Sequence, residues 1–279
     1  MAADVLADRR IGPAERGRWS PLNAAGLVAE LDRLHDLDVN FDDADGPRGA
    51  DDPRWHVDSG LADLGTEVAG PPTPGGAFDT ACALVRDYEF TDHRLIRGIY
   101  RPAGPLLGRD MLLEGRFLAL RFYLGVRVTA VVDETREGPD GPLRVWGWTY
   151  RTLDGHLEQG TLTYEITKDL GSGAVTFGIH AFSRRAPIPN PLVRMGFGVF
   201  GRSTQLSFYQ RAGRRMHRLV TGHSPGDPLP RPAPLLGDVV IAPSASRTRP
   251  WDPLALPVTH HGTRPGRAGV RRDSAADRA

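Results

Sequence analysis

The sequence predicts an α+β fold in which a curved antiparallel sheet of five to seven strands wraps a long C-terminal helix. Between Leu95 and Phe182, apolar residues recur at every second position, which is typical of half-buried strands. The run that follows Asn190-Pro191 reaches Val220 without another proline and keeps a helical spacing of apolar residues. Because a sheet must cover its apolar face, and only this run is long enough to lie along it, we expect the two to pack together.

One or two short N-terminal helices are expected before the sheet. Ser20 and Pro21 suit the start of a helix, and leucines then recur at helical spacing to about Leu37. A second helix is expected from about Ala77 to Phe90. The stretch from Asn40 to Gly76 is rich in turn residues and is predicted to be a long connection, in which Trp55 to Gly60 packs on another part of the chain.

The strands of the predicted sheet are separated by short runs of glycine, aspartate and proline. Such short connections favour antiparallel neighbours, because a parallel crossover needs about a dozen residues or more. In each strand we expect alternate residues to share one face. These sets are Val126, Val128, Ala130 and Val132; Trp146, Trp148 and Tyr150; Leu162, Tyr164 and Ile166; and Val175, Phe177, Ile179 and Ala181.

The chain is expected to contain one folded unit between two less ordered ends. Residues 1–19 are predicted to be flexible, residues 20–222 to form a single α+β domain, and residues 223–279 to be a mostly disordered tail. The tail is rich in proline and arginine and lacks periodic apolar residues, so it cannot bury enough surface to offset its chain entropy. A strip around Leu235 to Ile241 is the part of the tail that could dock on the domain.

Composition argues against several classes of function. The formal net charge of +1 gives no strong field toward nucleic acid. Cys82 is the only cysteine, so a disulfide framework is excluded and a small buried thiol is expected rather than a nucleophile. The sequence has no apolar stretch long enough for a signal peptide or a membrane span, which predicts a cytoplasmic protein that does not span a membrane. It also lacks phosphate-binding and dinucleotide-binding glycine motifs, so no cofactor is expected.

Three segments carry a resemblance to a known family. Tyr150 to Gly160 resembles the GTLPGHPExGE segment, and Ala181 to Pro187 the AFSRPA segment, of the uncharacterised family named domain of unknown function nineteen-ninety. Val126 to Glu134 is similar to the RVVYVVDE strand of the same family. The resemblance covers roughly Leu22 to Val220. Because the family has no assigned activity, membership implies domain boundaries and a fold but no reaction.

The chain departs from the family pattern at three motif positions. Arg151 replaces a glycine, Leu157 a proline, and Thr161 an acidic residue. The loss of that last carboxylate weakens any mechanism built on a pair of motif acids. The expected sheet and helix also resemble the helix-grip fold of plant pollen-allergen-like and lipid-transfer proteins, which implies a cavity between helix and sheet.

The leading hypothesis is a binding module that holds a small hydrophobic molecule between the long helix and the sheet. Trp146, Trp148 and Tyr150 offer a rigid apolar face for such a ligand, although aromatic residues at strand spacing are also ordinary core residues. His156, Glu158 and His180 complete the expected ligand-binding set. A metal site would need a further ligand such as Glu165 or His180, and because the spacing does not require one, no metal is predicted.

Two other hypotheses remain open. His156 and Glu158 are two residues apart and could act as acid and base in an enzyme, or they could simply fasten a hairpin whose turn is Asp154-Gly155. The tail could instead recruit protein partners. The sequence does not predict the oligomeric state. A final basic cluster can be interpreted as a solvated face that complements the helix dipole, or as a surface for a membrane or nucleic acid; it consists of Arg211, Arg214, Arg215, His217 and Arg218.

Overall fold

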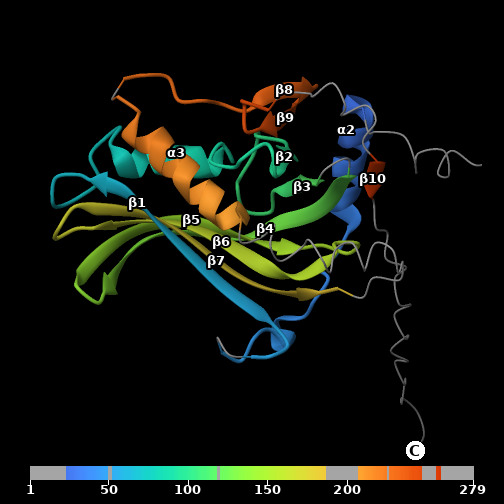
Figure 1. Ribbon diagram of the computed structural model, residues 1–279, viewed down its shortest axis with the longest axis horizontal. Helices are drawn as coiled ribbons and strands as arrows, with labels where there is room; N and C mark the ends of the chain where they lie inside the picture. The colour runs from blue at the N-terminus through green and yellow to red at the C-terminus, as the bar shows by residue number, and fades with distance from the viewer. Residues whose placement is uncertain are drawn as a thin grey trace, which may run out of the picture.

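A computed structural model describes residues 23–49, 52–117, 120–186, 207–224, 226–246 and 256–258. The strands in this part of the chain join into one sheet (Figure 1). Their bounds are β1 (His56–Thr66), β2 (Ile96–Tyr100), β3 (Asp110–Phe117), β4 (Leu120–Gly138), β5 (Gly141–Thr152), β6 (Glu158–Asp169), β7 (Ala174–Arg185), β8 (Ala233–Leu236), β9 (Val239–Ala242) and β10 (Leu256–Val258). The helices are α2 (Ala24–Arg33), α3 (Ala77–Arg86) and a further helix over residues 207–221, and there are short 3-10 turns at Leu34–Asp36 and Asp43–Asp45.

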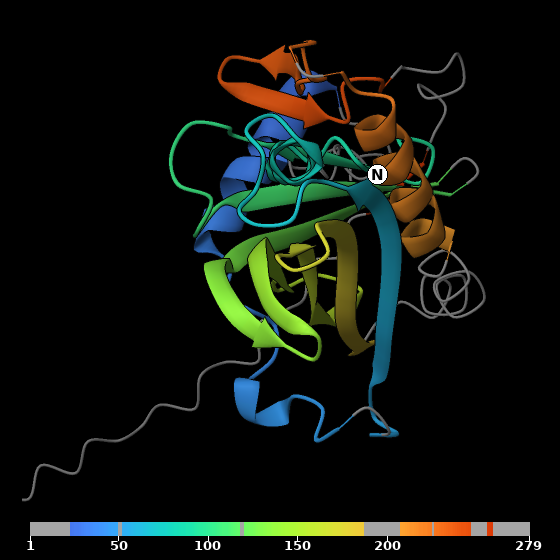
Figure 2. The ribbon, with the colours of Figure 1, turned by 90° about the vertical axis from the view of Figure 1, so that its left-hand side faces the viewer.

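The sheet is a large, curved, antiparallel structure, as the alternating pattern predicted. Strands β2 to β7 pair in chain order, β1 returns to pair with the outer side of β7, and β9 pairs with β2. The order is β1-β7-β6-β5-β4-β3-β2-β9-β8, with β10 added parallel to β4, so the sheet has more strands than the five to seven expected. Figure 2, which looks toward one end of the molecule, shows how strongly the sheet curves.

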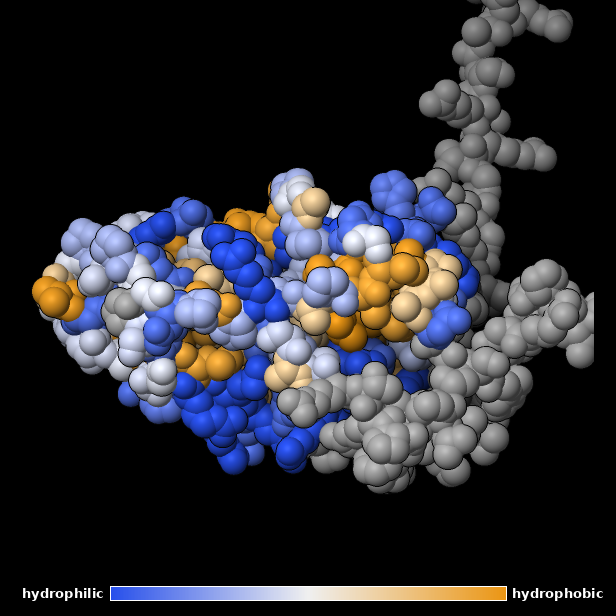
Figure 3. Space-filling view, turned by 90° about the horizontal axis from the view of Figure 1, so that it is seen from above, coloured by the Kyte–Doolittle hydropathy of each residue, from blue (hydrophilic) through white to orange (hydrophobic). Residues whose placement is uncertain are grey.

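Helices cover both faces of the sheet and give it two hydrophobic cores. The larger core lies on the face covered by α3 and the 207–221 helix, and the smaller one lies under α2. Neighbouring residues of one strand enter different cores, as Ile99 and Tyr100 do in β2, because successive side chains point to opposite faces. Seen from above, apolar residues also gather at the surface on the side of α2, β8 and β9 (Figure 3), where Leu236 is 48% exposed.

Local sequence explains where the first two helices begin and end. The Asn23 side chain caps α2 by accepting a hydrogen bond from the Gly26 amide at 2.9 Å, whereas the predicted start at Ser20 and Pro21 lies outside the described residues. Helix α3 stops before the predicted Phe90. Tyr88 takes a left-handed backbone conformation with φ 59°, and the Glu89 amide bonds back to the Leu84 carbonyl, which is a helix-ending arrangement usually built on glycine.

The predicted long C-terminal helix is not shown at its full length. Residues 207–221 are helical, while residues 187–206, which carry the first half of the prediction, lie outside the described residues. Each of the helices among the described residues is short, and none is long and apolar enough to cross a membrane. The strip around Leu235 to Ile241 falls in β8 and β9, and residues 1–19 and most of the remaining tail lie outside the described residues.

Two expectations about strands need correction. The predicted connection from Asn40 to Gly76 contains β1, an eleven-residue strand at one edge of the sheet. Its inward positions include Gly60 and Ala62, so the apolar alternation that marks a strand is weak there. In β4, a register shift between Val128 and Ala130 reverses the facing of the residues after it. Ala130 and Val132 therefore do not share the buried face of Val126 and Val128.

Candidate functional site

A groove runs along the edge of the sheet between β1 and the 207–221 helix, and we call it the edge groove. Its volume is about 630 Å³. One wall is the middle of β1, from Ser59 to Asp63, and the other is the outward flank of the helix. Figure 2 shows this helix standing beside β1, the strand at the edge of the curved sheet. The helix contributes Tyr209, Gln210, Gly213, Arg214, His217 and Arg218 to the groove.

The floor of the edge groove consists of two residues of the main core. Phe177 and Ile179 are 1% and 2% exposed, yet both line the groove. Both residues border the groove because their partners across the β1–β7 ladder are small: Phe177 lies opposite Ala62, and Ile179 lies opposite Gly60. Larger side chains at these two positions in β1 would cover the floor. The groove therefore lies directly over the apolar interior at the edge of the sheet.

Small residues also fix how closely the helix approaches β1. A Cβ atom on Gly213 would lie 3.1 Å from the Cβ of Ala62, and a Cβ on Gly60 would lie 3.6 Å from the Cβ of Tyr209. Near one end of the groove, His217 Nδ1 donates to the backbone oxygen of Asp63 at 2.6 Å. This bond shows that Asp63 turns its backbone polar groups toward the open edge of β1. By strand alternation Ser59 and Leu61 do the same, so the β1 wall is partly polar backbone.

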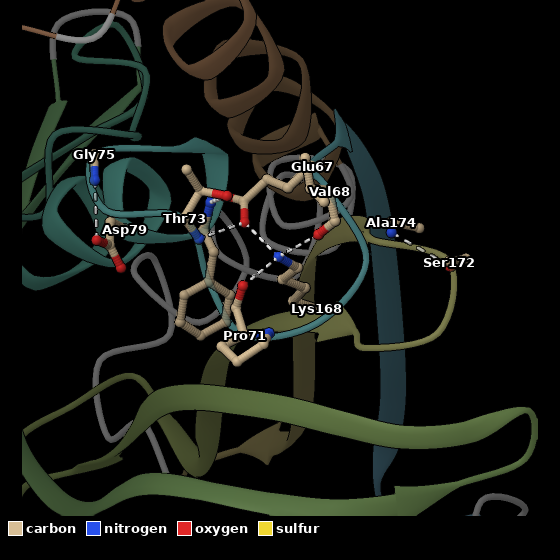
Figure 4. Close-up of polar contacts among 10 residues, drawn as sticks. Glu67, Val68, Pro71, Thr73, Gly75, Asp79, Lys168, Ser172 and Ala174 are labelled. Carbon is tan, nitrogen blue, oxygen red and sulfur yellow. Dashed lines mark hydrogen bonds and ion pairs between the residues drawn. The ribbon is translucent and has the colours of Figure 1, made fainter.

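A buried ion pair anchors the end of the β1 wall. Lys168 of β6 is 0% exposed, and its ammonium donates to Glu67 Oε2 at 2.7 Å, to the Val68 oxygen at 3.0 Å and to the Pro71 oxygen at 2.9 Å (Figure 4). Burial raises the pKa of the Glu67 carboxyl, but the hydrogen bonds from Lys168 and from the Phe78 and Thr73 amides outweigh it and hold that pKa below its usual value. The pair fastens the segment between β1 and α3 to the sheet.

The predicted aromatic face exists, but α3 helps to cover it. Trp146, Trp148 and Tyr150 are all buried in the main core. The Trp148 indole donates to the Val85 oxygen of α3 at 3.3 Å, and the Arg86 guanidinium lies 5.2 Å from the centre of the Trp146 ring. None of the three aromatic residues lines the edge groove. A role for them in ligand binding stays a prediction.

His156 and Glu158 lie at the start of β6, away from the edge groove. The His156 ring is buried, and its Nδ1 accepts a hydrogen bond from the Glu158 amide at 2.9 Å. Burial lowers the pKa of the imidazole to about 4, so the ring is neutral near pH 7. This geometry corresponds to the hairpin-fastening alternative, in which His156 organises local backbone. His180 lies on β7 with its side chain exposed and pairs with Ser59 and Thr163 across the sheet.

The structure thus does not bring the six predicted site residues together at one place. Other residues of the Tyr150 to Gly160 segment form hydrogen bonds that hold the backbone of β5 and β6. Asn40 bridges two strands: its Nδ2 donates to the Glu158 oxygen at 2.9 Å, and its Oδ1 accepts from Thr152 Oγ1 at 2.6 Å. The Gly160 amide donates to the same hydroxyl oxygen at 3.0 Å. A Cβ on Gly160 would lie 2.1 Å from the Phe182 oxygen, so only glycine fits.

An aromatic cluster completes this attachment of the loop before β1. The Trp55 ring meets the Phe182 ring edge-on with centres 5.1 Å apart, and Phe41 packs against both. The Arg184 guanidinium lies 4.5 Å from the centre of the Trp55 ring and donates to Gln159 at 2.8 Å. The segments Tyr150 to Gly160 and Ala181 to Pro187 therefore join the loop and the sheet, and Pro187 itself lies outside the described residues.

The remaining reactive groups do not assemble into a second site in the described part of the chain. Burial raises the pKa of the Cys82 thiol well above its usual value, which suits the small core residue that was expected. The described residues contain no group of three or more histidine, cysteine or carboxylate side chains placed to hold a metal. A second hollow, of about 470 Å³, lies between α2 and the loop before β3. Two of the charged residues that line it, Arg101 and Asp32, form an ion pair with each other at 2.8 Å.

Sequence reasoning missed the edge groove because its parts are far apart in the chain. Leu61 lies within the predicted connection from Asn40 to Gly76, Phe177 in a predicted strand, and Tyr209 in the predicted long helix. The available signal was the pair of small residues, Gly60 and Ala62, beside an exposed leucine. On their own such residues are more typical of a loop, so the signal becomes useful only once β1 is known to be paired with β7.

Comparison with known proteins gives one family and a set of distant structures. A family model described as Domain of unknown function (DUF1990) matches residues 43–215. No protein with a curated description matches the chain. A crystal structure of Ara h 8.0201 is 13% identical with a TM-score of 0.36, and it covers 61% of this chain and 99% of its own.

Two further solved structures show the same degree of likeness. The major latex-like protein 151 from Panax ginseng is 10% identical with a TM-score of 0.38, covering 59% of this chain and 96% of its own. A point mutant of norcoclaurine synthase from Thalictrum flavum, in complex with a transition-state analogue, is 10% identical with a TM-score of 0.38, covering 61% and 96%.

Proposed function

This chain belongs to the DUF1990 family, whose description assigns no activity, and from its own geometry we propose that it binds a small, mainly apolar molecule in the edge groove. The observation that carries the proposal is an open groove whose floor consists of residues of the main core. Phe177 and Ile179 belong to the main hydrophobic core, yet both line an open concave surface. An apolar ligand placed there would extend the core outward, and its own apolar surface would be removed from water.

The dimensions and the lining suit a ligand of that class. A volume of about 630 Å³ lies within the range of roughly 300 to 1,000 Å³ that is common for small-molecule sites. Ala62 and Gly213 add small apolar surface where β1 meets the helix. Tyr209 adds an amphipathic ring on the helix wall. Apolar surface with a few polar groups at the margin favours binding over catalysis.

No comparable observation favours the enzyme hypothesis. An acid–base pair has to reach a bound substrate, within hydrogen-bond distance or through one water. The buried His156 ring instead receives the Glu158 amide, and neither residue lines the groove. The hypothesis of a partner-recruiting tail concerns residues that lie largely outside the described part of the chain.

The first test combines ligand identification with a blocked groove. Native mass spectrometry of the purified protein, followed by solvent extraction, shows whether an apolar molecule is carried. Binding is then measured with the neutral fluorophore N-phenyl-1-naphthylamine, which brightens in apolar surroundings. Gln210→Trp places an indole on the helix wall of the groove, and we expect it to weaken probe binding about tenfold or more, because the indole takes the space that the probe needs.

The matched control is Val57→Trp. Val57 is an exposed residue of β1 that does not line the groove, so the same tryptophan is introduced outside it. It should leave probe affinity unchanged, and both variants should keep the wild-type thermal midpoint. Equal probe binding by the wild type and a folded Gln210→Trp variant would show that the edge groove is not the binding site.

A further inference from the structure

The basic cluster on the 207–221 helix divides into two sets with different surroundings. Arg211 and Arg215 face the segment that follows α3. Arg211 pairs with Asp92 at 3.1 Å, and Arg215 Nε donates to the Glu89 oxygen at 3.0 Å. These two arginines therefore attach the helix to the rest of the domain, and this contact accounts for them without a bound ligand.

The second set, Arg214, His217 and Arg218, faces the edge groove. Their spacing of three and four residues places them on one side of the helix, and all three are exposed. The hydrogen-bond partner of Arg214 is the neutral Gln210, at 3.4 Å. Within the described part of the chain, neither Arg214 nor Arg218 pairs with a carboxylate at ion-pair distance, although both stand beside an apolar floor.

One carboxylate, Asp63, also lines the groove. Its Oδ1 accepts the Gly65 amide at 2.9 Å, and its backbone oxygen accepts from His217, so this residue is held at one end of the groove. Counting formal charges, the two arginines and Asp63 leave the rim with an excess of positive charge even when His217 is neutral. A rim of this sign above an apolar floor matches a molecule with an apolar body and an anionic group.

We propose that the ligand of the edge groove is an anionic amphiphile, whose apolar body rests on Phe177 and Ile179 and whose anionic group is bound by Arg214 and Arg218. This inference rests on the proposed function and adds the chemical class of the ligand. The alternative explanation is that the arginines only complement the negative end of the helix dipole, because they lie in its last two turns. That explanation predicts no preference between charged and neutral ligands.

The test uses two probes with the same aromatic skeleton. 8-Anilinonaphthalene-1-sulfonate carries one sulfonate, and N-phenyl-1-naphthylamine is its uncharged counterpart. We expect the wild type to bind the sulfonate more tightly, and Arg214→Gln with Arg218→Gln to weaken that probe by about 3- to 10-fold, the range for two exposed charge contacts. The neutral probe should bind this double variant as well as it binds the wild type. Raising the salt concentration should weaken only the sulfonate.

The control variant removes the same charge elsewhere. Arg94→Gln with Arg185→Gln changes two exposed arginines that do not line the groove, and it should keep the wild-type preference for the sulfonate. If both probes bind the wild type equally well, or if the preference for the sulfonate survives the Arg214 and Arg218 changes, the inference of an anionic ligand is wrong, but binding in the edge groove is not contradicted. If neither probe binds the wild type, the proposed function fails, and this inference fails with it.

Discussion

Replacing Glu67 by alanine tests how the buried ion pair supports the wall of the edge groove. The Glu67 carboxylate accepts three hydrogen bonds: from Lys168 Nζ at 2.7 Å, from the Phe78 amide at 2.8 Å and from the Thr73 amide at 3.0 Å. Its loss leaves Lys168 as an ammonium that is 0% exposed and bound only to two neutral carbonyls. A buried charge without a counter-charge is costly, because the interior solvates it poorly.

The expected cost of Glu67→Ala is about 3 to 5 kcal/mol of unfolding free energy, the range for removing one partner of a buried pair. Urea or guanidinium unfolding followed by circular dichroism measures it. The double change Glu67→Ala with Lys168→Met should recover part of this loss, since it removes the uncompensated charge together with its partner. Glu30→Ala is the matched control: Glu30 pairs with Arg33, whose side chain is 56% exposed, so the cost should be about 0.5 kcal/mol or less.

Acid should remove the contribution of this pair. The pKa of Glu67 in the folded protein lies below its value in the unfolded chain, so the unfolded chain takes up the proton first as pH falls. The stability that the pair provides is therefore fully present above the unfolded pKa and is lost as pH falls through the folded one. A loss below about 1 kcal/mol for Glu67→Ala near pH 7 would refute the view that a poorly solvated ammonium remains behind.

Two further predictions concern buried positions. The pKa of His156 is about 4 in the folded protein and 6.5 for the free side chain, so the unfolded chain binds more protons between these pH values. The unfolding free energy should therefore fall by roughly 3 kcal/mol from pH 7 to pH 4. His156→Asn should flatten this part of a curve of stability against pH, and an unchanged slope would contradict a lowered pKa at His156. Gly98→Ala should cost about 1 to 3 kcal/mol in a denaturant titration, because the new Cβ would lie 2.6 Å from the Tyr88 ring. Gly115→Ala, where the nearest atom is 3.6 Å away, should cost less than Gly98→Ala, and equal costs would argue against the Tyr88 contact.

The sheet was predictable from the sequence where its signal is local. Strands β5 to β7 carry apolar residues at alternate positions and are joined by short turns, so the faces of residues such as Trp148 and Phe177 follow from the pattern, and both are buried. The same rule failed in β4. There, the register shift after Val128 adds one residue to one strand, and no residue type in the sequence marks its position.

The candidate site was not predictable, because it depends on contacts between distant segments. β1 pairs with β7 over a separation of more than a hundred residues, and its small inward residues make sense only beneath a helix that comes later in the chain. The basic cluster on the C-terminal helix could also be recognised from the sequence, but its division into an attaching set and a set that faces the groove could not. Whether Arg211 or Arg214 is used for attachment depends on where Asp92 lies in space.

Lys168 is the only lysine of the chain, so the enclosure of its ammonium has a practical consequence. In the native fold its three donors are occupied and its side chain is fully enclosed, so reagents that acylate side-chain amines find no target until this region opens. Modification at this one position, read by mass spectrometry, therefore records how often the segment between β1 and α3 detaches from the sheet. The chain carries its own single-site reporter of local opening beside the wall of the groove.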